Sequence, residues 1–170
     1  MTPGSGEGVT RGRTITEADV VAFSALTGDH HPQHTDAIWA GAGPFGGIVA
    51  HGMLVLSYAL GLVELDPDRI VALRRIEDVV FKRPVRIGDT IHVVAKLARP
   101  DEGRGLEGWE WRILNQDGEL VIRARIEAVV RREDSEEVGA EDSGGGGAED
   151  SDAGARDSEP AADDDAAVRT

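Results

Sequence analysis

The spacing of hydrophobic and polar residues changes once along the chain. Before residue 69, apolar residues recur at helical spacing or form one continuous run, and from residue 69 onwards apolar and polar residues alternate. Alternation is typical of β-strands that bury one face. Helices followed by strands with short connections predict an α+β fold with an antiparallel sheet.

The first helix is predicted to begin after Thr16, which can cap a first turn that contains Glu17 and Asp19. An extended arm or short strand over residues 11–15 precedes it, and the helix is expected to end at Gly28. The apolar side chains expected to form its buried face are Val20, Val21, Phe23, Ala25 and Leu26.

Two further helices are predicted before the strands. A short one covers residues 37–40, with Thr35-Asp36 able to cap it, and Ile38 and Trp39 are expected to anchor it by packing. A longer helix over residues 53–63 is apolar nearly all round, so it must be buried on most of its sides.

Strands are predicted over residues 70–82, 90–97, 109–113 and 120–130. A bulge is expected near Arg74-Arg75, a hairpin turn at residues 115–118 and a longer loop at residues 100–105. Because a wholly apolar helix accompanies a sheet with one strongly apolar face, the sheet is expected to curl around that helix.

The net charge of −14 belongs almost entirely to one end of the chain. Residues 133–170 hold 14 acidic and 2 basic residues, whereas residues 1–132 carry a net charge of −2. The acidic segment has almost no large apolar residue, so it is predicted to be a disordered tail. Residues 1–8 are predicted to be a flexible lead, which leaves residues 9–132 as the folded domain. This domain is not basic enough to indicate nucleic-acid binding.

The sequence contains no cysteine, which excludes disulfides, thiolate catalysis and cysteine-based zinc sites. The N-terminus has no basic-then-apolar signal pattern, and the longest apolar run is too short to span a bilayer. A cytoplasmic protein without membrane insertion is therefore expected.

Residues 28–34, Gly-Asp-His-His-Pro-Gln-His, place one carboxylate and three imidazoles in one short stretch. The glycine and the proline interrupt regular structure, so Asp29 and His34 are expected on a shaped loop and not on one helix face. The plain alternative is a helix-ending turn with polar surface side chains. A metal site of Asp29, His30 and His34 is another alternative, although no metal is expected here.

Two further stretches extend this pattern: residues 50–53, Ala-His-Gly-Met, and residues 81–90, Phe-Lys-Arg-Pro-Val-Arg-Ile-Gly-Asp-Thr. With residues 28–34 they resemble the MaoC-like family of hot-dog-fold acyl-thioester dehydratases, also called (R)-specific enoyl-CoA hydratases. That family has a Gly-Asp-x-Asn-Pro-hydrophobe-His motif, an Ala-His-Gly-Met opening of the central helix, and a strand–turn–strand after it. This sequence differs from the family motif at two positions. His31 stands where the motif has Asn, and a histidine can cap a helix in place of Asn. Gln33 stands where the motif has a hydrophobic residue.

The resemblance covers residues 10–132 and implies a hot-dog fold, a homodimer and no cofactor. It also implies reversible addition of water to a trans-2-enoyl-CoA, or to the thioester of a carrier protein, giving the (R)-3-hydroxyacyl thioester. Asp29 and His34 would hold the water and serve as base and acid, with the division between them open. The backbone N–H of Gly52 would hold the thioester oxygen. The other residues expected at the substrate are His51, Ser57 and His31.

Two other functions remain open at this stage: a non-catalytic acyl-thioester-binding subunit and a hot-dog acyl-CoA thioesterase. The Asp29/His34 pair argues against both, because a binder does not need it and hot-dog thioesterases place their carboxylate elsewhere. Most cations of the strands are expected in solvent, and one or two could meet the phosphates of a CoA: Arg74, Arg75, Lys82, Arg83 and Arg86.

Overall fold

The computed structural model describes residues 8–131. The predicted tail and residues 1–7 of the predicted lead lie outside the described residues. The helices are α1 (Glu17–Thr27), α2 (Pro32–Thr35), α3 (Ala37–Ala42) and α4 (Gly52–Leu62). The strands are β1 (Gly8–Val9), β2 (Arg13–Thr14), β3 (Ile70–Phe81), β4 (Thr90–Arg99), β5 (Leu106–Leu114) and β6 (Leu120–Val130).

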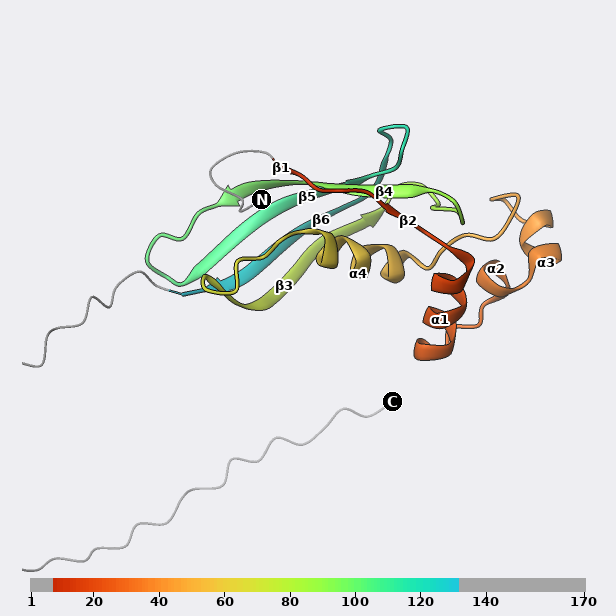
Figure 1. Ribbon diagram of the computed structural model, residues 1–170, viewed down its shortest axis with the longest axis horizontal. Helices are drawn as coiled ribbons and strands as arrows, with labels where there is room; N and C mark the ends of the chain where they lie inside the picture. The colour runs from red at the N-terminus through yellow and green to blue at the C-terminus, as the bar shows by residue number, and fades with distance from the viewer. Residues whose placement is uncertain (1–7, 132–170) are drawn as a thin grey trace, which may run out of the picture. The chain divides into compact units, whose positions relative to one another are not determined.

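Within the described residues the strand pairings are antiparallel, in the order β1-β4-β5-β6-β3, and β2 also pairs with β4. Helix α4 lies along one face of the sheet, and the other three helices gather beyond the end of the sheet at which α4 begins (Figure 1). Buried side chains of α4 and of the strands form one hydrophobic core. A sheet wrapped on one central helix is the hot-dog arrangement, so the predicted fold class is confirmed.

None of the helices in residues 8–131 has the length and apolar character needed to cross a membrane. At the N-terminal side, Gly8 pairs with Ala95 of β4. The sheet therefore includes Gly8, one residue earlier than the predicted start of the domain.

The alternation along the strands places every second side chain against the helix. Trp111, in the middle of β5, is 2% exposed and lies opposite Ala95 of β4 and Ala124 of β6. Two alanines beside the largest side chain leave room for the indole ring, so bulk alternates across the three strands. The positions predicted to face inward on β5 (Trp109, Trp111 and Ile113) are all buried.

Helix α1 begins as predicted, with a reciprocal cap at its first turn. The Thr16 side chain accepts a hydrogen bond from the N–H of Asp19, and the Asp19 carboxylate accepts from the N–H of Thr16. Tyr58 of α4 and Arg13 of β2 also donate to this carboxylate. Burial acts to raise the pKa of Asp19, but the hydrogen bonds from Tyr58 and Thr16, together with Arg13, outweigh it and lower the pKa to about 2.

The buried face of α1 differs from the prediction. Val21 and Leu26, expected in the core, are 62% and 82% exposed, and Ala25 is exposed as well. Val20 and Ser24 are the buried residues of this helix. The physical reason is the position of α1 beyond the end of the sheet (Figure 1), where Val20 and Ser24 are its buried residues.

The prediction that Ile38 and Trp39 anchor the second predicted helix is wrong. Helix α3 does begin after Asp36, whose carboxylate accepts hydrogen bonds from the N–H groups of Ile38 and Trp39. However, the side chains of Ile38 and Trp39 are 88% and 47% exposed, and Ala40 is the buried residue of the helix. The anchoring therefore comes from a small side chain that allows close approach, together with the cap.

Helix α4 is buried on most of its sides, as predicted. Its buried residues are Leu54, Val55, Leu56, Ala59 and Leu62. The exposed residues Met53, Ser57 and Gly61 follow one another at a spacing of four residues and form one narrow stripe.

Strand β3 is an edge strand with an irregular register. Its pairing with β6 shifts at three places, and the shift between Leu73 and Arg75 confirms the predicted bulge. In the described residues, β3 pairs only with β6, so its other edge is open. Val71, Leu73 and Phe81 on this strand are 59%, 46% and 51% exposed.

Candidate active site

The segment between α1 and α2 carries the predicted catalytic residues. Helix α1 ends at Gly28, which has the left-handed conformation (φ 77°) that glycine adopts at little cost. Asp29 follows, and α2 is a single turn with a proline at its first position. The Nδ1 atom of His31 accepts a hydrogen bond from the N–H of Gln33 at 3.2 Å, so His31 caps α2. His34 therefore lies on a one-turn helix, which the sequence prediction had taken as irregular loop.

His34 is held in one tautomer by the backbone. Its Nδ1 atom lies 2.6 Å from the carbonyl oxygen of Val49, and the N–H of Val49 donates to the carbonyl of Gln33. Because a carbonyl only accepts, Nδ1 of His34 carries the hydrogen and Nε2 keeps the lone pair. Burial lowers the pKa of His34, and the Val49 carbonyl opposes this effect.

The structure brings Asp29 and His34 together. A carboxylate oxygen of Asp29 and ring nitrogens of His34 and His51 lie within 4.8 Å of one another. The Oδ1 atom of Asp29 accepts from the N–H of His31 at 3.2 Å, and the Asp29 side chain is 52% exposed. A fixed carboxylate beside an imidazole with a free lone pair can hold a water molecule and exchange a proton with it.

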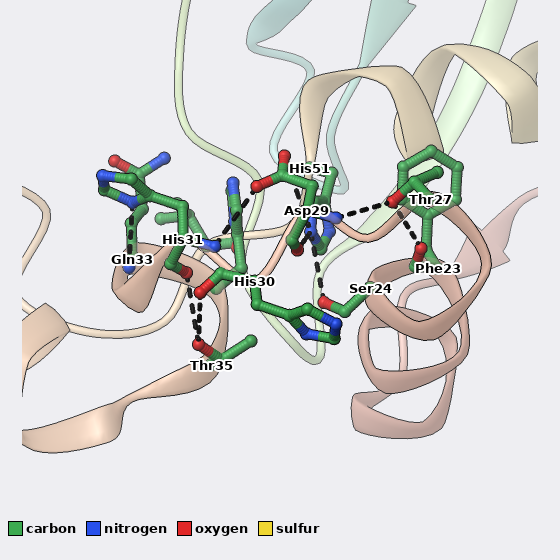
Figure 2. Close-up of polar contacts among 11 residues, drawn as sticks. Phe23, Ser24, Thr27, Asp29, His30, His31, Gln33, Thr35 and His51 are labelled. Atoms are coloured by element: carbon green, nitrogen blue, oxygen red, sulfur yellow. Dashed lines mark hydrogen bonds and ion pairs between the residues drawn. The ribbon is translucent and has the colours of Figure 1, made fainter.

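His51, which was expected at the substrate, is buried behind this pair, with only 3% of its side chain exposed. Its ring stacks on the ring of His34, with 3.8 Å between centroids and 25° between planes. Its Nε2 atom lies 3.1 Å from the carbonyl oxygen of Asp29 and 3.3 Å from Oγ of Ser24, contacts that Figure 2 draws. The histidine thus contacts both members of the pair.

Sequence reasoning missed Ser24. Its side chain is 3% exposed, and its hydroxyl meets His51 from α1. The available signal was a polar residue at helical spacing from Val20 and four positions before Gly28, on a face that had to be buried if Val20 was.

A cavity of about 390 Å³ lies beside His34. Gly52 and Met53 at the start of α4 and Phe81 at the end of β3 form part of its wall. An ideal Cβ on residue 52 would lie 2.4 Å from the Phe81 ring, so this packing requires glycine there. The predicted oxyanion donor therefore lies at the cavity wall, at the N-terminus of a helix where N–H groups lack helical partners.

The other predicted site residues do not line this cavity. Asp29 adjoins it through His34, and His31 and His51 stand away from its wall. Ser57 is exposed and donates its hydroxyl hydrogen to the carbonyl of Met53 at 2.7 Å, within α4. His30 is exposed, and it lies with His34 at a second, smaller cavity of about 230 Å³.

With the site in view, the comparisons with known proteins decide the family. The sequence model described as "MaoC like domain" matches residues 2–108. The chain belongs to the MaoC-like domain family. Protein MaoC of Klebsiella aerogenes is 44% identical over 82 residues, which are 48% of this chain and 24% of that protein. The (R)-specific enoyl-CoA hydratase of Aeromonas caviae is 31% identical over 114 residues, 67% of this chain and 84% of the hydratase.

The chain is also similar to a solved structure. The X-ray structure of a monoamine oxidase regulatory protein from Archaeoglobus has a TM-score of 0.69 and 37% identity, and the match covers 78% of this chain and 97% of that one. The chain spans about a quarter of the Klebsiella aerogenes protein. Similarity to that part of the protein therefore does not establish the activity of the whole protein for this chain.

In this MaoC-like site, Asp29, His34 and His51 have the spacing to hold a metal ion. However, Nε2 of His51 must carry a hydrogen, because the carbonyl oxygen beside it only accepts. A nitrogen that carries a hydrogen cannot be a ligand, so Nε2 of His51 is not available to a metal ion in this arrangement. The set considered from the sequence contained His30, which is not part of the cluster.

Proposed function

We propose that this domain catalyses the reversible addition of water to a trans-2-enoyl thioester, giving the (R)-3-hydroxyacyl thioester. The observation that carries the proposal is the pair of Asp29 and His34, of which a carboxylate oxygen and a ring nitrogen lie within 4.8 Å of each other beside a cavity of about 390 Å³. The hydro-lyase names of relatives such as the Aeromonas caviae hydratase support the same reaction class.

In the proposed reaction, one water molecule is held between Asp29 and His34. The pair takes a proton from the water as its oxygen attacks C3 of the enoyl group, and a proton is delivered to C2. Negative charge develops meanwhile on the thioester oxygen. The N–H of Gly52 donates no hydrogen bond within residues 8–131, so it is available to that oxygen.

The substrate is proposed to be an acyl-CoA or the thioester of an acyl carrier protein. Both present a phosphate on the pantetheine arm, and cations at the cavity fit that group. Lys82 and Arg83 line the cavity next to Phe81. Arg83 also pairs with Glu119 at 3.3 Å, which leaves Lys82 as the cation of the two with no ion pair in the described residues.

A homodimer is proposed as the active form. The edge of β3 is open in the described residues, and exposed apolar side chains follow it. An open edge strand of this kind can pair with the same strand of a second copy. Phe81 lies on this strand and at the cavity wall, so pairing at β3 would also cover the cavity.

The test is hydration of trans-2-enoyl-CoA substrates of several chain lengths by the purified protein. Asp29→Asn and His34→Ala are each expected to lower the rate by about a hundredfold or more, the usual scale for a positioned acid or base. His30→Ala, in the same segment but exposed, is the matched control and should retain the parental rate. Release of free CoA in place of hydration would identify a thioesterase, and binding without turnover would identify a non-catalytic subunit.

A further inference from the structure

His51 is a buried histidine that the proposed reaction does not use directly. It precedes α4 as its N-cap residue, yet its side chain makes no capping hydrogen bond. Instead, the ring contacts three side chains and one backbone carbonyl. It stacks on His34 and meets the Phe23 ring at 5.1 Å between centroids, and its Nε2 atom approaches Ser24 and the Asp29 carbonyl. A helix-capping role therefore does not explain a histidine at this position.

The hydrogen-bond partners assign the tautomer of His51. The carbonyl oxygen of Asp29, 3.1 Å from Nε2, can only accept, so Nε2 carries the hydrogen of the neutral ring. The hydroxyl of Ser24, 3.3 Å from the same atom, serves as a second acceptor. The lone pair is then on Nδ1, which is buried and has no hydrogen-bond partner. A buried ring whose only satisfied nitrogen points at the Asp29 backbone is placed to hold that backbone.

We propose that His51 is a positioning residue that fixes the distance between Asp29 and His34, with Ser24 restraining its ring. The Nε2–H holds the backbone of Asp29, and the ring face supports the ring of His34, so one side chain restrains both members of the pair. Asp29 needs this restraint because it lies in an irregular segment between two helices and is half exposed. The kinetic test of this inference rests on the proposed function, whereas the spectroscopic test does not.

Two substitutions separate the two contacts of His51. His51→Gln keeps an N–H at about the reach of Nε2 and loses the ring, whereas His51→Phe keeps a ring and loses the donor. Both are expected to lower kcat more than they change KM, because they misplace reacting groups and leave the cavity wall intact. His51→Phe should show the larger loss, on the order of a hundredfold. Ile126→Val is the control for a general loss of stability, because Ile126 is buried on β6, pairs with Trp109 and Ile76, and does not line the cavity.

The spectroscopic arm observes His34 directly. In protein labelled with ¹⁵N-histidine, the Nδ1–H of His34 should give a protected, downfield proton signal because it donates to Val49. In His51→Gln, which loses the ring, this signal is expected to shift or broaden. His51→Phe, which keeps a ring, should change it less, and Ile126→Val should match the parent. If both His51 variants fail to fold, Ser24→Ala, which removes only the contact to the ring, is expected to show the same signs in weaker form.

The outcomes are distinct. Parental kcat in either folded His51 variant, or a loss confined to KM, overturns the positioning role. In His51→Gln, which loses the ring, a loss of kcat with an unchanged His34 signal would overturn the support of His34 by that ring. If the parent hydrates no enoyl thioester, the proposed function fails. The His34 signal then still decides whether His51 positions the pair.

Discussion

The Nδ1–H of His34 and the carbonyl oxygen of Val49 are joined by a hydrogen bond of 2.6 Å. The N–H of Val49 in turn donates to the carbonyl of Gln33, next to His34 in the chain, at 3.3 Å. This reciprocal pair of bonds ties α2 to the segment before α4. The orientation of His34 is thus set by backbone groups, and no substrate is needed to establish it.

The first prediction concerns the pH dependence of activity. Burial lowers the pKa of His34 from 6.5, and the His51 and His31 rings act in the same direction, while the Val49 carbonyl and the Asp29 carboxylate oppose them. The Nε2 lone pair therefore survives to a lower pH than in a free histidine. We expect the acid limb of kcat/KM to have its midpoint below pH 6.5, the ordinary pKa of histidine.

The same shift carries a stability effect whose sign can be worked out. In the unfolded chain His34 binds its proton at the ordinary pKa, and in the folded domain only at a lower pH, so protons favour the unfolded chain. The stability that His34 contributes through this shift is therefore complete above the ordinary pKa of histidine. It is lost as the pH falls through the pKa that His34 has in the folded domain. A pH–rate profile and chemical denaturation over the same range measure both effects. An acid limb centred above pH 6.5 would contradict the assignment.

The second prediction concerns the Gly52 donor. Because any β-carbon at residue 52 meets the Phe81 ring, the test needs a background in which that ring is absent. We expect Gly52→Pro in a Phe81→Ala background to lose about a hundredfold in kcat relative to Phe81→Ala alone, since proline lacks the N–H. Calorimetric affinity for a saturated acyl-CoA should change much less. Equal losses of affinity and turnover would indicate a steric or folding defect.

The third prediction concerns the edge of β3. Leu73→Lys places a charge on this edge strand and is expected to convert a dimer into monomers, measured by light scattering during size-exclusion chromatography. Ile38→Lys is the matched control, because Ile38 is 88% exposed on α3, away from the sheet. Activity should fall together with dimer content. A monomeric parent would refute the proposed dimer, and a Leu73→Lys variant that remains a dimer with full activity would refute pairing at β3.

The fourth prediction concerns Asp19. Its pKa of about 2 means that its hydrogen bonds stabilise the fold at any pH above its unfolded value and are lost as the pH falls through about 2. Asp19→Asn is therefore expected to destabilise the domain by about 1–2 kcal/mol near neutral pH, the scale of a lost helix cap. The difference from the parent should shrink in acid. Urea unfolding at several pH values tests this, and a difference independent of pH would exclude a role of the charge.

The periodic parts of the sequence predicted the fold well. The strands were predictable because alternation reports the burial of one face directly, as with Trp109 and Trp111 on β5. The buried face of α1 was not predictable in this way, because Val21 and Leu26 are apolar side chains that the domain leaves exposed. Apolar character alone cannot tell a helix beside a sheet from a helix beyond its end.

The candidate site was predictable in its residues and less so in their arrangement. Asp29 and His34 are close in the chain, so local geometry was enough to bring them together. The place of His51 and the involvement of Ser24 depend on how α1 and the start of α4 meet, which is a tertiary contact between residues 27 positions apart. Local sequence patterns carry no information about such a contact.

The wall of the cavity has a consequence for how such a domain can change. The residues that carry the proposed chemistry fall between Ser24 and Gly52, whereas residues 81–85 and Ile122 form another part of the cavity wall. A large part of the wall can therefore be changed without substituting a residue that is proposed to react. A library of variants substituted only at residues 81–85 could alter which acyl groups are accepted, while the proposed proton-transfer residues Asp29 and His34 stay unchanged.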